Sequence, residues 1–100
     1  MFIAMNRFGV TTGREDAFEQ IWRERESQLE SVPGFKEFHL LRGPSDAEST
    51  LYVSHSVWIS RDAFEAWTRS EAFRRAHAGA RTPEGTLLGH PSFEGFEAVL

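Results

Sequence analysis

His77 is the residue whose surroundings best suit the binding of a ligand. It lies in the segment Ser70–Ala80 (SEAFRRAHAGA), which is typical of a helix that runs into small residues. Because Ala78, Gly79 and Ala80 follow it, its imidazole has little bulk beside it, and a large flat ligand has room to approach the ring. A histidine near a helix end is also a common surface residue that interacts with the helix dipole. His77 alone therefore leaves metal ligation and a surface position open.

The other residues of catalytic type form no recognisable site in the sequence. His39 and His55 lie in predicted strands without carboxylates at ligand spacing and are interpreted as structural, whereas His90 lies in a loop and is expected to be solvated. The chain has no nucleophile elbow, phosphate-binding loop or dinucleotide fingerprint. The acidic residues of the first predicted helix are expected along a solvated face, with nothing to pair them in a cleft: Glu15, Glu19, Glu24, Glu26 and Glu30.

Length and composition indicate one small globular domain that spans residues 1–100. The net charge of −4, without a basic tract, argues against nucleic-acid binding. The absence of cysteine excludes a disulfide framework, a thiolate nucleophile and an iron–sulfur cluster, and it fits the cytoplasm. The N-terminal segment does not resemble a signal peptide, and no apolar segment is long enough to span a membrane.

The first half of the chain predicts a strand, a helix and a second strand. Phe2–Val10 alternates with period two and places Asn6 on an otherwise apolar face. A helix is expected from Arg14 to about Ser31, and the pair Pro33-Gly34 stops it. Its inner stripe follows helical spacing and includes one charged member: Phe18, Ile21, Trp22, Arg25 and Leu29.

The second half begins with a predicted hairpin. It joins the strands Phe35–Arg42 and Thr50–Trp58 through turn residues that start with Gly43-Pro44. Ser60 is a candidate N-cap for a helix over Arg61–Arg69, which carries Phe64 and Trp67 on one face. The remaining elements are a helical piece capped by Ser70 that carries Phe73 and His77, a loop over Arg81–Pro91, and a last strand over Ser92–Leu100.

The resulting order, β-α-β-β-α-β, is that of a ferredoxin-like α+β domain, an antiparallel sheet with its helices on one face. The other face carries apolar residues such as Ile3 and Met5, and nothing in the chain is available to cover it. A second copy of the sheet would do so, and we therefore expect a homodimer.

Three residues are expected to converge between the sheet and the helices, where a pocket would lie. Asn6 lies on the helix-facing side of the first strand, and Trp67 and His77 lie on the inner faces of two consecutive short helices. Two of them, and Arg25 on the first helix, also have simpler interpretations. Asn6 suits a buried amide bonded to backbone, Trp67 suits a core residue, and Arg25 suits a side chain whose stem covers apolar surface.

With these residues in place, the chain resembles the IsdG-type haem-degrading monooxygenases, a branch of the antibiotic biosynthesis monooxygenase superfamily. The resemblance covers essentially the whole chain. Pro-Gly-Phe is common across the superfamily and indicates only the fold, whereas the Asn, Trp and His at these spacings point to haem. Four parts carry the resemblance: Asn6 in IAMNRF, the stretch SVPGFKEFHLLRG at Ser31–Gly43, Trp67 in DAFEAWTRSEAF, and His77 in RRAHAGA.

The resemblance implies a dimeric α+β barrel that binds one haem per protomer and opens the porphyrin ring with O2 and electrons from an external donor, a reductase. His77 would be the proximal ligand of the haem iron, Asn6 would hydrogen-bond an iron-bound ligand on the distal side, and Trp67 would press on the macrocycle. Trp22 and Arg25 are weaker candidates for the distal pocket, where Arg25 suits a propionate. The product would be a linear, biliverdin-like tetrapyrrole together with free iron.

Three alternatives remain open. A cofactor-free monooxygenase of the same superfamily would use the same pocket for a quinol or another aromatic substrate without His77 as a metal ligand. A haem-binding protein without enzymatic activity would keep the ligand set. A structural dimer would need no ligand. The sequence favours neither a biliverdin nor an oxo-bilirubin type of product.

Overall fold

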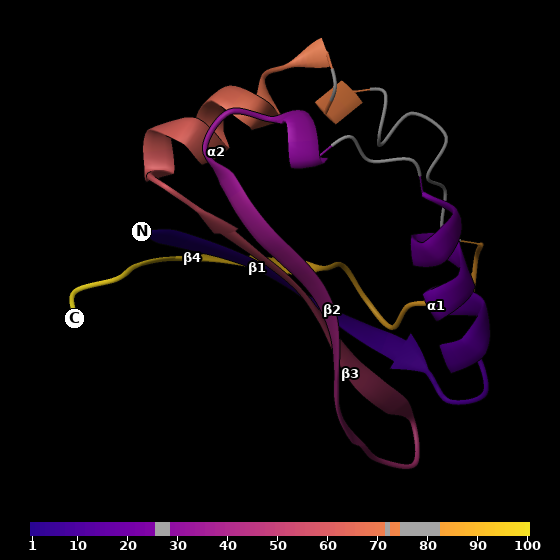
Figure 1. The fold of residues 1–100 in the computed structure, drawn as a ribbon. Coiled ribbons are helices and arrows are strands. Elements are labelled where there is room, and N and C mark those ends of the chain that lie inside the picture. Colours follow the sequence, from indigo (N-terminus) through magenta and orange to yellow (C-terminus); the bar gives the residue numbers. More distant parts are fainter. Residues whose placement is uncertain (26–28, 72, 75–82) are drawn as a thin grey trace.

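The computed structural model describes residues 1–25, 29–71, 73–74 and 83–100 (Figure 1). Its strands form one sheet in the order β2-β3-β1-β4, in which every pair of neighbours is antiparallel. Both helices lie on the same side of the sheet, as the ferredoxin-like pattern predicts (Figure 1). The elements are β1 (Phe2–Thr11), α1 (Glu15–Glu24), the 3-10 turn η1 (Leu29–Ser31), β2 (Phe35–Ser45), β3 (Ser49–Trp58), α2 (Arg61–Thr68) and β4 (Ser92–Glu97).

The first helix is shorter than predicted. α1 ends at Glu24 instead of Ser31, because Arg25 adopts an extended backbone with ψ of 119°. The guanidinium of Arg25 lies 4.0 Å from the centroid of the Trp22 ring, so the chain leaves the helix axis where this stacking forms. Leu29 is buried in a different part of the core from Phe18. The predicted stripe is therefore divided between α1 and η1.

The hairpin extends beyond its predicted turn. β2 runs through Gly43 and Pro44 to Ser45, with a register shift between Arg42 and Ser45, and only residues 46–48 connect it to β3. The carboxylate of Asp46 makes this tight turn by accepting hydrogen bonds from the backbone amides of residues 48 and 49, at 2.7 and 2.9 Å. The position of Pro44 is tolerated because β2 is an edge strand.

The caps of the short helices agree with their predictions. The Ser60 hydroxyl accepts a hydrogen bond of 3.2 Å from the amide of Ala63 at the start of α2, and the Ser70 hydroxyl accepts one of 3.1 Å from Phe73. α2 ends one residue early, at Thr68, and β4 ends at Glu97 instead of Leu100. Within the part of the chain that the structure describes, no helix has both the length and the apolar character needed to cross a membrane.

The core consists of two clusters on the helix-facing side of the sheet. The α2 half of the core has Phe2, Ala4, Leu29 and Trp58 at its centre, with partly buried side chains of α2 packed against them. The α1 half has Val10, Phe18 and Tyr52 at its centre. Trp58 and Val10 are fully buried, so the centre of each cluster is shielded from solvent. The space between the two halves is where a ligand site can form.

The opposite face of the sheet carries an apolar patch that none of the described helices covers (Figure 1). The register places side chains of all four strands on it, and Leu41 and Phe96 remain 43% and 46% exposed. This outer-face patch comprises Ile3, Met5, Leu41, Val53 and Phe96, and Val57 on the same face is buried.

Candidate active site

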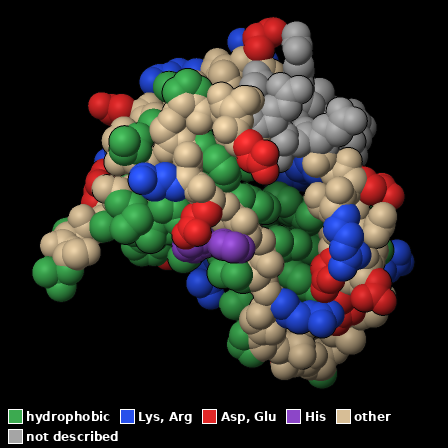
Figure 2. Space-filling view, in the orientation of Figure 1, with side chains coloured by type: hydrophobic (Ala, Val, Ile, Leu, Met, Phe, Trp, Pro, Cys, Tyr) green, Lys and Arg blue, Asp and Glu red, His purple; other side chains and the backbone are tan. Residues whose placement is uncertain are grey.

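A cavity of about 410 Å³ lies between the sheet and the helices, at the boundary between the two core halves. Figure 2 shows apolar side chains gathered in the recess between α1 and the sheet. The volume lies within the usual range of small-molecule sites. The apolar and aromatic side chains that line it are Ala4, Trp22, Leu29, Phe38, Phe64, Trp67, Phe73 and Phe93, and the polar ones are Asn6, Arg25, Ser54, Ser56 and Thr68.

Four of the five predicted site residues line this cavity. Asn6 comes from β1, Trp22 and Arg25 come from the end of α1, and Trp67 comes from α2. The fifth, His77, lies outside the described residues, as does most of the predicted helical piece that carries it. The two weaker candidates of the sequence, Trp22 and Arg25, are therefore as much part of the cavity wall as Asn6 and Trp67.

Asn6 presents an amide to the cavity from the middle of the sheet. Its neighbours in register are Ser54 on β3 and Phe93 on β4, which line the same cavity. No hydrogen bond joins the side-chain amide of Asn6 to another residue that the structure describes. Within the described part of the chain, both its donor and its acceptor are therefore available to a ligand.

Arg25 carries a positive charge into the cavity wall. Its guanidinium stacks on Trp22, whose ring is in turn stacked on Phe38 with a centroid distance of 5.7 Å and an angle of 21°. Burial lowers the pKa of Arg25, but an arginine remains cationic at neutral pH. Its Nε atom is buried, with no hydrogen-bond partner among the described residues. An unpartnered buried donor on a cation favours an anionic or oxygen-bearing ligand.

Trp67 belongs both to the cavity wall and to the core. Its ring meets that of Phe73 edge-on at 4.8 Å and lies 5.3 Å from that of Trp58. Trp58 is anchored in turn by a hydrogen bond of 3.0 Å from its indole nitrogen to Ser56 Oγ. The two interpretations of Trp67 are thus compatible, because packing behind the ring fixes the orientation of the face that a ligand meets.

Sequence reasoning missed several residues of the cavity wall. Ser54 and Ser56 of β3 and Phe93 of β4 lie on the same sheet face as Asn6. Their period-two spacing within each strand was available in the sequence, but the register between strands was not. Phe38 lines the cavity because β2 lies beside β3 in the sheet, and its ring stacks on that of Trp22.

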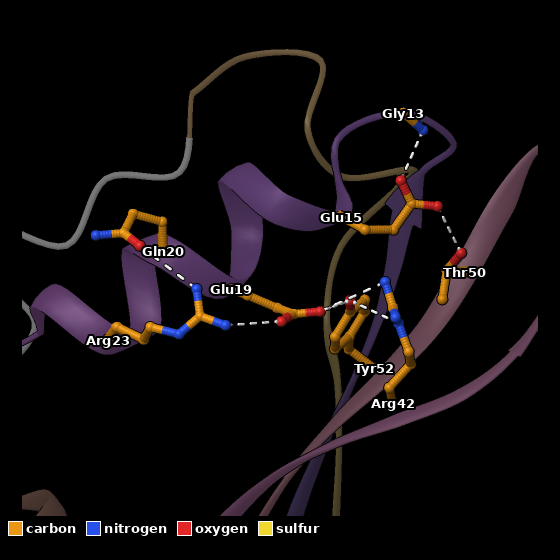
Figure 3. Close-up of polar contacts among 8 residues, drawn as sticks. All are labelled: Gly13, Glu15, Glu19, Gln20, Arg23, Arg42, Thr50 and Tyr52. Carbon is orange, nitrogen blue, oxygen red and sulfur yellow. Dashed lines mark hydrogen bonds and ion pairs between the residues drawn. The ribbon is translucent and has the colours of Figure 1, made fainter.

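A polar network joins α1 to the sheet and corrects the prediction of a solvated acidic face for Glu15 and Glu19 (Figure 3). Glu24 and Glu30 are exposed as predicted, and Glu26 lies outside the described residues. The Tyr52 hydroxyl donates to the carboxylate of Glu19 and accepts a bond of 3.0 Å from Arg42 Nε. The Arg23 guanidinium forms an ion pair with the Glu19 carboxylate at 3.1 Å, and the Thr50 hydroxyl donates a hydrogen bond of 2.8 Å to Glu15. The carboxylates point inward because positions 15 and 19 share the helix face that looks onto β3.

The network borders a second cavity of about 460 Å³ that shares Trp22 and Phe38 with the first. Burial and, after it, the hydrogen bond to Glu19 raise the pKa of Tyr52, so the phenol is protonated at neutral pH. The hydrogen bond to Tyr52 raises the pKa of Arg42. The second cavity is therefore lined by a neutral phenol, one carboxylate, and the two cations Arg23 and Arg42.

The remaining histidines do not approach this site. His39 and His55 face each other across β2 and β3 on the outer face of the sheet, with ring centroids 6.2 Å apart. His90 is exposed, as predicted. Within residues 1–25, 29–71, 73–74 and 83–100, no group of three or more His, Cys, Asp or Glu side chains could hold a metal ion.

The fold and cavity agree with what comparison with known proteins finds. The family model for antibiotic biosynthesis monooxygenases matches residues 1–79, which is most of the chain. The chain belongs to this family. The matched range contains all five predicted site residues, and β4, which follows it, completes the family domain's sheet by pairing with β1.

Within the antibiotic biosynthesis monooxygenase family, similar proteins include haem oxygenases. A mycobilin-producing heme oxygenase of Mycobacterium tuberculosis H37Rv is 35% identical over 98 residues, which cover 98% of this chain and 89% of that protein. A staphylobilin-producing heme oxygenase of Staphylococcus haemolyticus is 29% identical over 77 residues, which cover 77% and 73%. The solved structure of the heme-degrader MhuD from M. tuberculosis, with two hemes bound in its active site, superposes with a TM-score of 0.74 at 34% identity, covering 100% of this chain and 97% of that one.

Proposed function

We propose that this protein is a haem-degrading monooxygenase. It opens the porphyrin ring of bound haem with O2 and electrons from an external donor, and it releases a linear tetrapyrrole and iron. The observation that carries the proposal is the similarity to a haem oxygenase over nearly the whole chain, combined with a cavity whose wall contains Asn6, Trp22, Arg25 and Trp67. The names of the two relatives, mycobilin-producing and staphylobilin-producing, give the two products to look for.

The described side chains fit haem as a substrate. Haem is a flat apolar ring with carboxylate side chains, and the cavity combines the ring faces of Trp22 and Trp67 with one cation. The buried Nε of Arg25, which lacks a partner among the described residues, would be satisfied by a propionate. The side-chain amide of Asn6 would be satisfied by a hydrogen bond to a ligand held in the cavity.

Each residue then has a role, which its position on the cavity wall supports for Asn6, Trp22, Arg25 and Trp67 and which the sequence alone supports for His77. Haem itself supplies the activation of O2 and is the molecule that becomes oxidised. We assign iron ligation to His77, which follows the cavity residue Phe73 by four positions in the chain. Asn6 would hydrogen-bond a ligand of the haem iron through its amide, and Trp67 would press on the macrocycle from α2. Trp22 and Arg25 would close the cavity wall from the end of α1.

We also propose that the protein acts as a homodimer that pairs the outer-face patches of two sheets. Leu41 and Phe96 in this patch are large apolar side chains that remain nearly half exposed. Burial of apolar area of this kind stabilises association by about 25 cal/mol per Å² before the cost of association is subtracted. Sedimentation at micromolar concentration tests this assembly, and replacing Leu41 with Lys should produce monomers.

Titration of the purified protein with hemin tests the function directly. We expect a sharpened and shifted Soret band that is lost in His77→Ala and retained in the control His90→Ala, since His90 is exposed in a loop. Addition of a reductant under air should bleach the band and release iron. A stable spectrum would indicate a haem carrier, and no binding at micromolar haem would contradict the proposal in favour of a cofactor-free monooxygenase.

Substitutions in the wall separate binding from turnover. Asn6→Ala should retain haem but lose most turnover, whereas the control Ser54→Ala, a neighbour in register, should lose less. Trp67→Phe should flatten the macrocycle and slow degradation more than Trp22→Phe does. Equal rates for wild type and Trp67→Phe would show that Trp67 is only a core residue. Mass spectrometry of the product then distinguishes the two types of tetrapyrrole.

A further inference from the structure

A chain of aromatic rings connects the haem cavity to the only tyrosine of the protein. Trp22 lines the cavity, the ring of Phe18 lies 6.2 Å from that of Trp22, and the ring of Tyr52 lies 5.0 Å from that of Phe18. Phe8 touches both Trp22 and Phe18, with centroid distances of 5.8 and 5.3 Å. Phe18 and Tyr52 are each 1% exposed, so this route runs through the buried part of the α1 half.

The far end of the route is built to accept a proton. The phenol of Tyr52 donates its hydrogen bond to Glu19, and Arg42 and Arg23 hold that carboxylate in place at 3.5 and 3.1 Å (Figure 3). The raised pKa of Tyr52 keeps its proton in place in the resting protein. A phenol that loses an electron becomes a strong acid, and its proton then has an acceptor already in contact.

We propose that Trp22 and Tyr52 form a radical-transfer route that draws oxidising equivalents out of the haem cavity. The inference rests on the proposed function, because haem reacting with peroxide in the cavity supplies the one-electron oxidant. That oxidant gains one electron from Trp22. The indole radical cation keeps its proton and gains one electron from Tyr52, while the phenolic proton moves to Glu19, which leaves a neutral tyrosyl radical and a protonated carboxyl. An external thiol or enediol reductant then returns one electron to Tyr52, and Glu19 returns the proton.

The second cavity lets such a reductant approach Tyr52, which is itself only 1% exposed, so that the electron crosses the cavity wall without direct contact with the ring. Tyr52 lines it together with Glu19, Arg23 and Arg42, and the two cations suit a small anionic donor. Trp22 and Phe38 separate this cavity from the haem cavity, so the donor can act without entering the substrate site. The route would therefore protect the aromatic wall of the haem cavity when oxidation does not end on the substrate.

Pulse radiolysis of the haem-free protein tests the route without any turnover. Azide radicals oxidise tryptophan, and the tryptophanyl absorption should then convert to tyrosyl absorption with a first-order rate that does not depend on protein concentration. Because the chain has one tyrosine, Tyr52→Phe must abolish the tyrosyl signal. Trp22→Phe should lower the rate and Trp67→Phe should leave it unchanged. Glu19→Gln should slow conversion by about a hundredfold, the lower end of what a positioned proton acceptor contributes.

The outcomes separate this route from the proposed function. Absence of tyrosyl in the wild type, or a rate that Trp22→Phe does not change, would overturn the route even if haem is degraded. If radical transfer occurs but hemin does not bind, the internal transfer stands, and its assignment to haem chemistry fails together with the proposed function. With haem and peroxide present, freeze-quenched samples should show a tyrosyl resonance that is missing in Tyr52→Phe, and its absence from the wild type would also contradict the route.

Discussion

The two halves of the core hold their helices to the sheet by different means. In the α2 half, rings interlock around Trp58, which meets Phe35 and Phe64 edge-on at 5.6 and 5.7 Å. In the α1 half, side-chain contacts of Phe18 are joined by the polar network of Glu15 and Glu19, which reaches across to β2 and β3. One helix is therefore positioned mainly by shape and the other by shape and charge together.

This difference teaches where a site can be placed in a small domain. The cavity lies where the two halves meet and takes Trp67 from one and Trp22 from the other. An interlocked apolar half gives the ligand a rigid wall, because close-packed rings move little. In the α1 half, hydrogen bonds of Glu15 and Glu19 hold the helix to the sheet, so Arg25 at the C-terminal end of the helix remains available to bind the ligand.

The largest expected effect comes from removing the centre of the α2 half. Trp58→Ala should lower the free energy of unfolding by about 3–5 kcal/mol, since the side chain is fully buried. Urea denaturation followed by circular dichroism measures the change. Trp58→Phe keeps a ring and should cost clearly less. If Trp58→Ala costs less than Glu19→Gln, the assignment of shape to the α2 half is wrong.

A turn glycine tests how closely the α2 half is packed. Gly34 has φ of +84°, and a Cβ there would lie 2.5 Å from the Cβ of Ala63. Gly34→Ala should therefore cost about 2–4 kcal/mol, as the sum of a left-handed backbone and steric overlap. Gly13, in the turn before α1, has φ of +94° and open space around its Cβ position. Gly13→Ala should cost only the backbone part, about 1–2 kcal/mol. Equal losses in thermal or urea unfolding would show that packing at Gly34 contributes nothing.

Loss of the central carboxylate should weaken the α1 half by a smaller amount. Glu19→Gln removes the charge that Arg23, Arg42 and Tyr52 share, at an expected cost of about 1–2 kcal/mol. The cost should shrink in high salt, because both arginines reach solvent. Glu24→Gln is the matched control, since Glu24 lies on the exposed helix face and bonds to Gln20 alone among the described residues. A loss for Glu24→Gln that equals that of Glu19→Gln would point to helix charge instead of the network.

The smallest effect is a pH dependence at Glu15. Hydrogen bonds from its own backbone amide, the Thr50 hydroxyl and the Gly13 amide hold the pKa of Glu15 below its usual value of 4.5. A lowered pKa stabilises the folded state above pH 4.5, and this stabilisation is lost as the pH falls through the folded-state pKa. Glu15→Gln should therefore melt below the wild type at pH 7, with a gap that closes below pH 4.5. Asp16→Asn controls for the helix dipole, and a gap that persists at low pH would contradict the assignment.

The strands and their order along the chain were predictable, because apolar and polar residues alternate in the strands and typical turn residues separate them. The helix end at Arg25 was not, since Arg25 fits the helical stripe, and only its stacking on Trp22 and the burial of Leu29 in the other half end the helix there. Gly43 and Pro44 are typical turn residues, but the hairpin continues past them as an edge strand.

The candidate site divides in the same way. Asn6, Trp22, Arg25 and Trp67 were found from residue type and face, which are local properties. The bonds of Glu19 to Tyr52 and of Glu15 to Thr50 join positions 33 and 35 residues apart, and their partners depend on how α1 settles on the sheet. No local pattern distinguishes such glutamates from solvated ones.

The loop that precedes β4 has a consequence for how this sheet can meet other chains. β4 pairs only with residues 2–7 of β1, and the rest of that strand is bonded to the loop instead, through Thr11 to Thr86 at 2.8 Å and Leu88 to Gly9 at 2.8 Å. On the opposite edge, Pro44 lies within β2 and has no backbone amide to donate to an added strand. The loop beside β1 and the proline in β2 therefore disfavour edge-to-edge addition of a further strand at these positions. Under the dimer that we propose, the sheet would meet a second copy through its broad outer face, which gives a closed pair instead of a growing array.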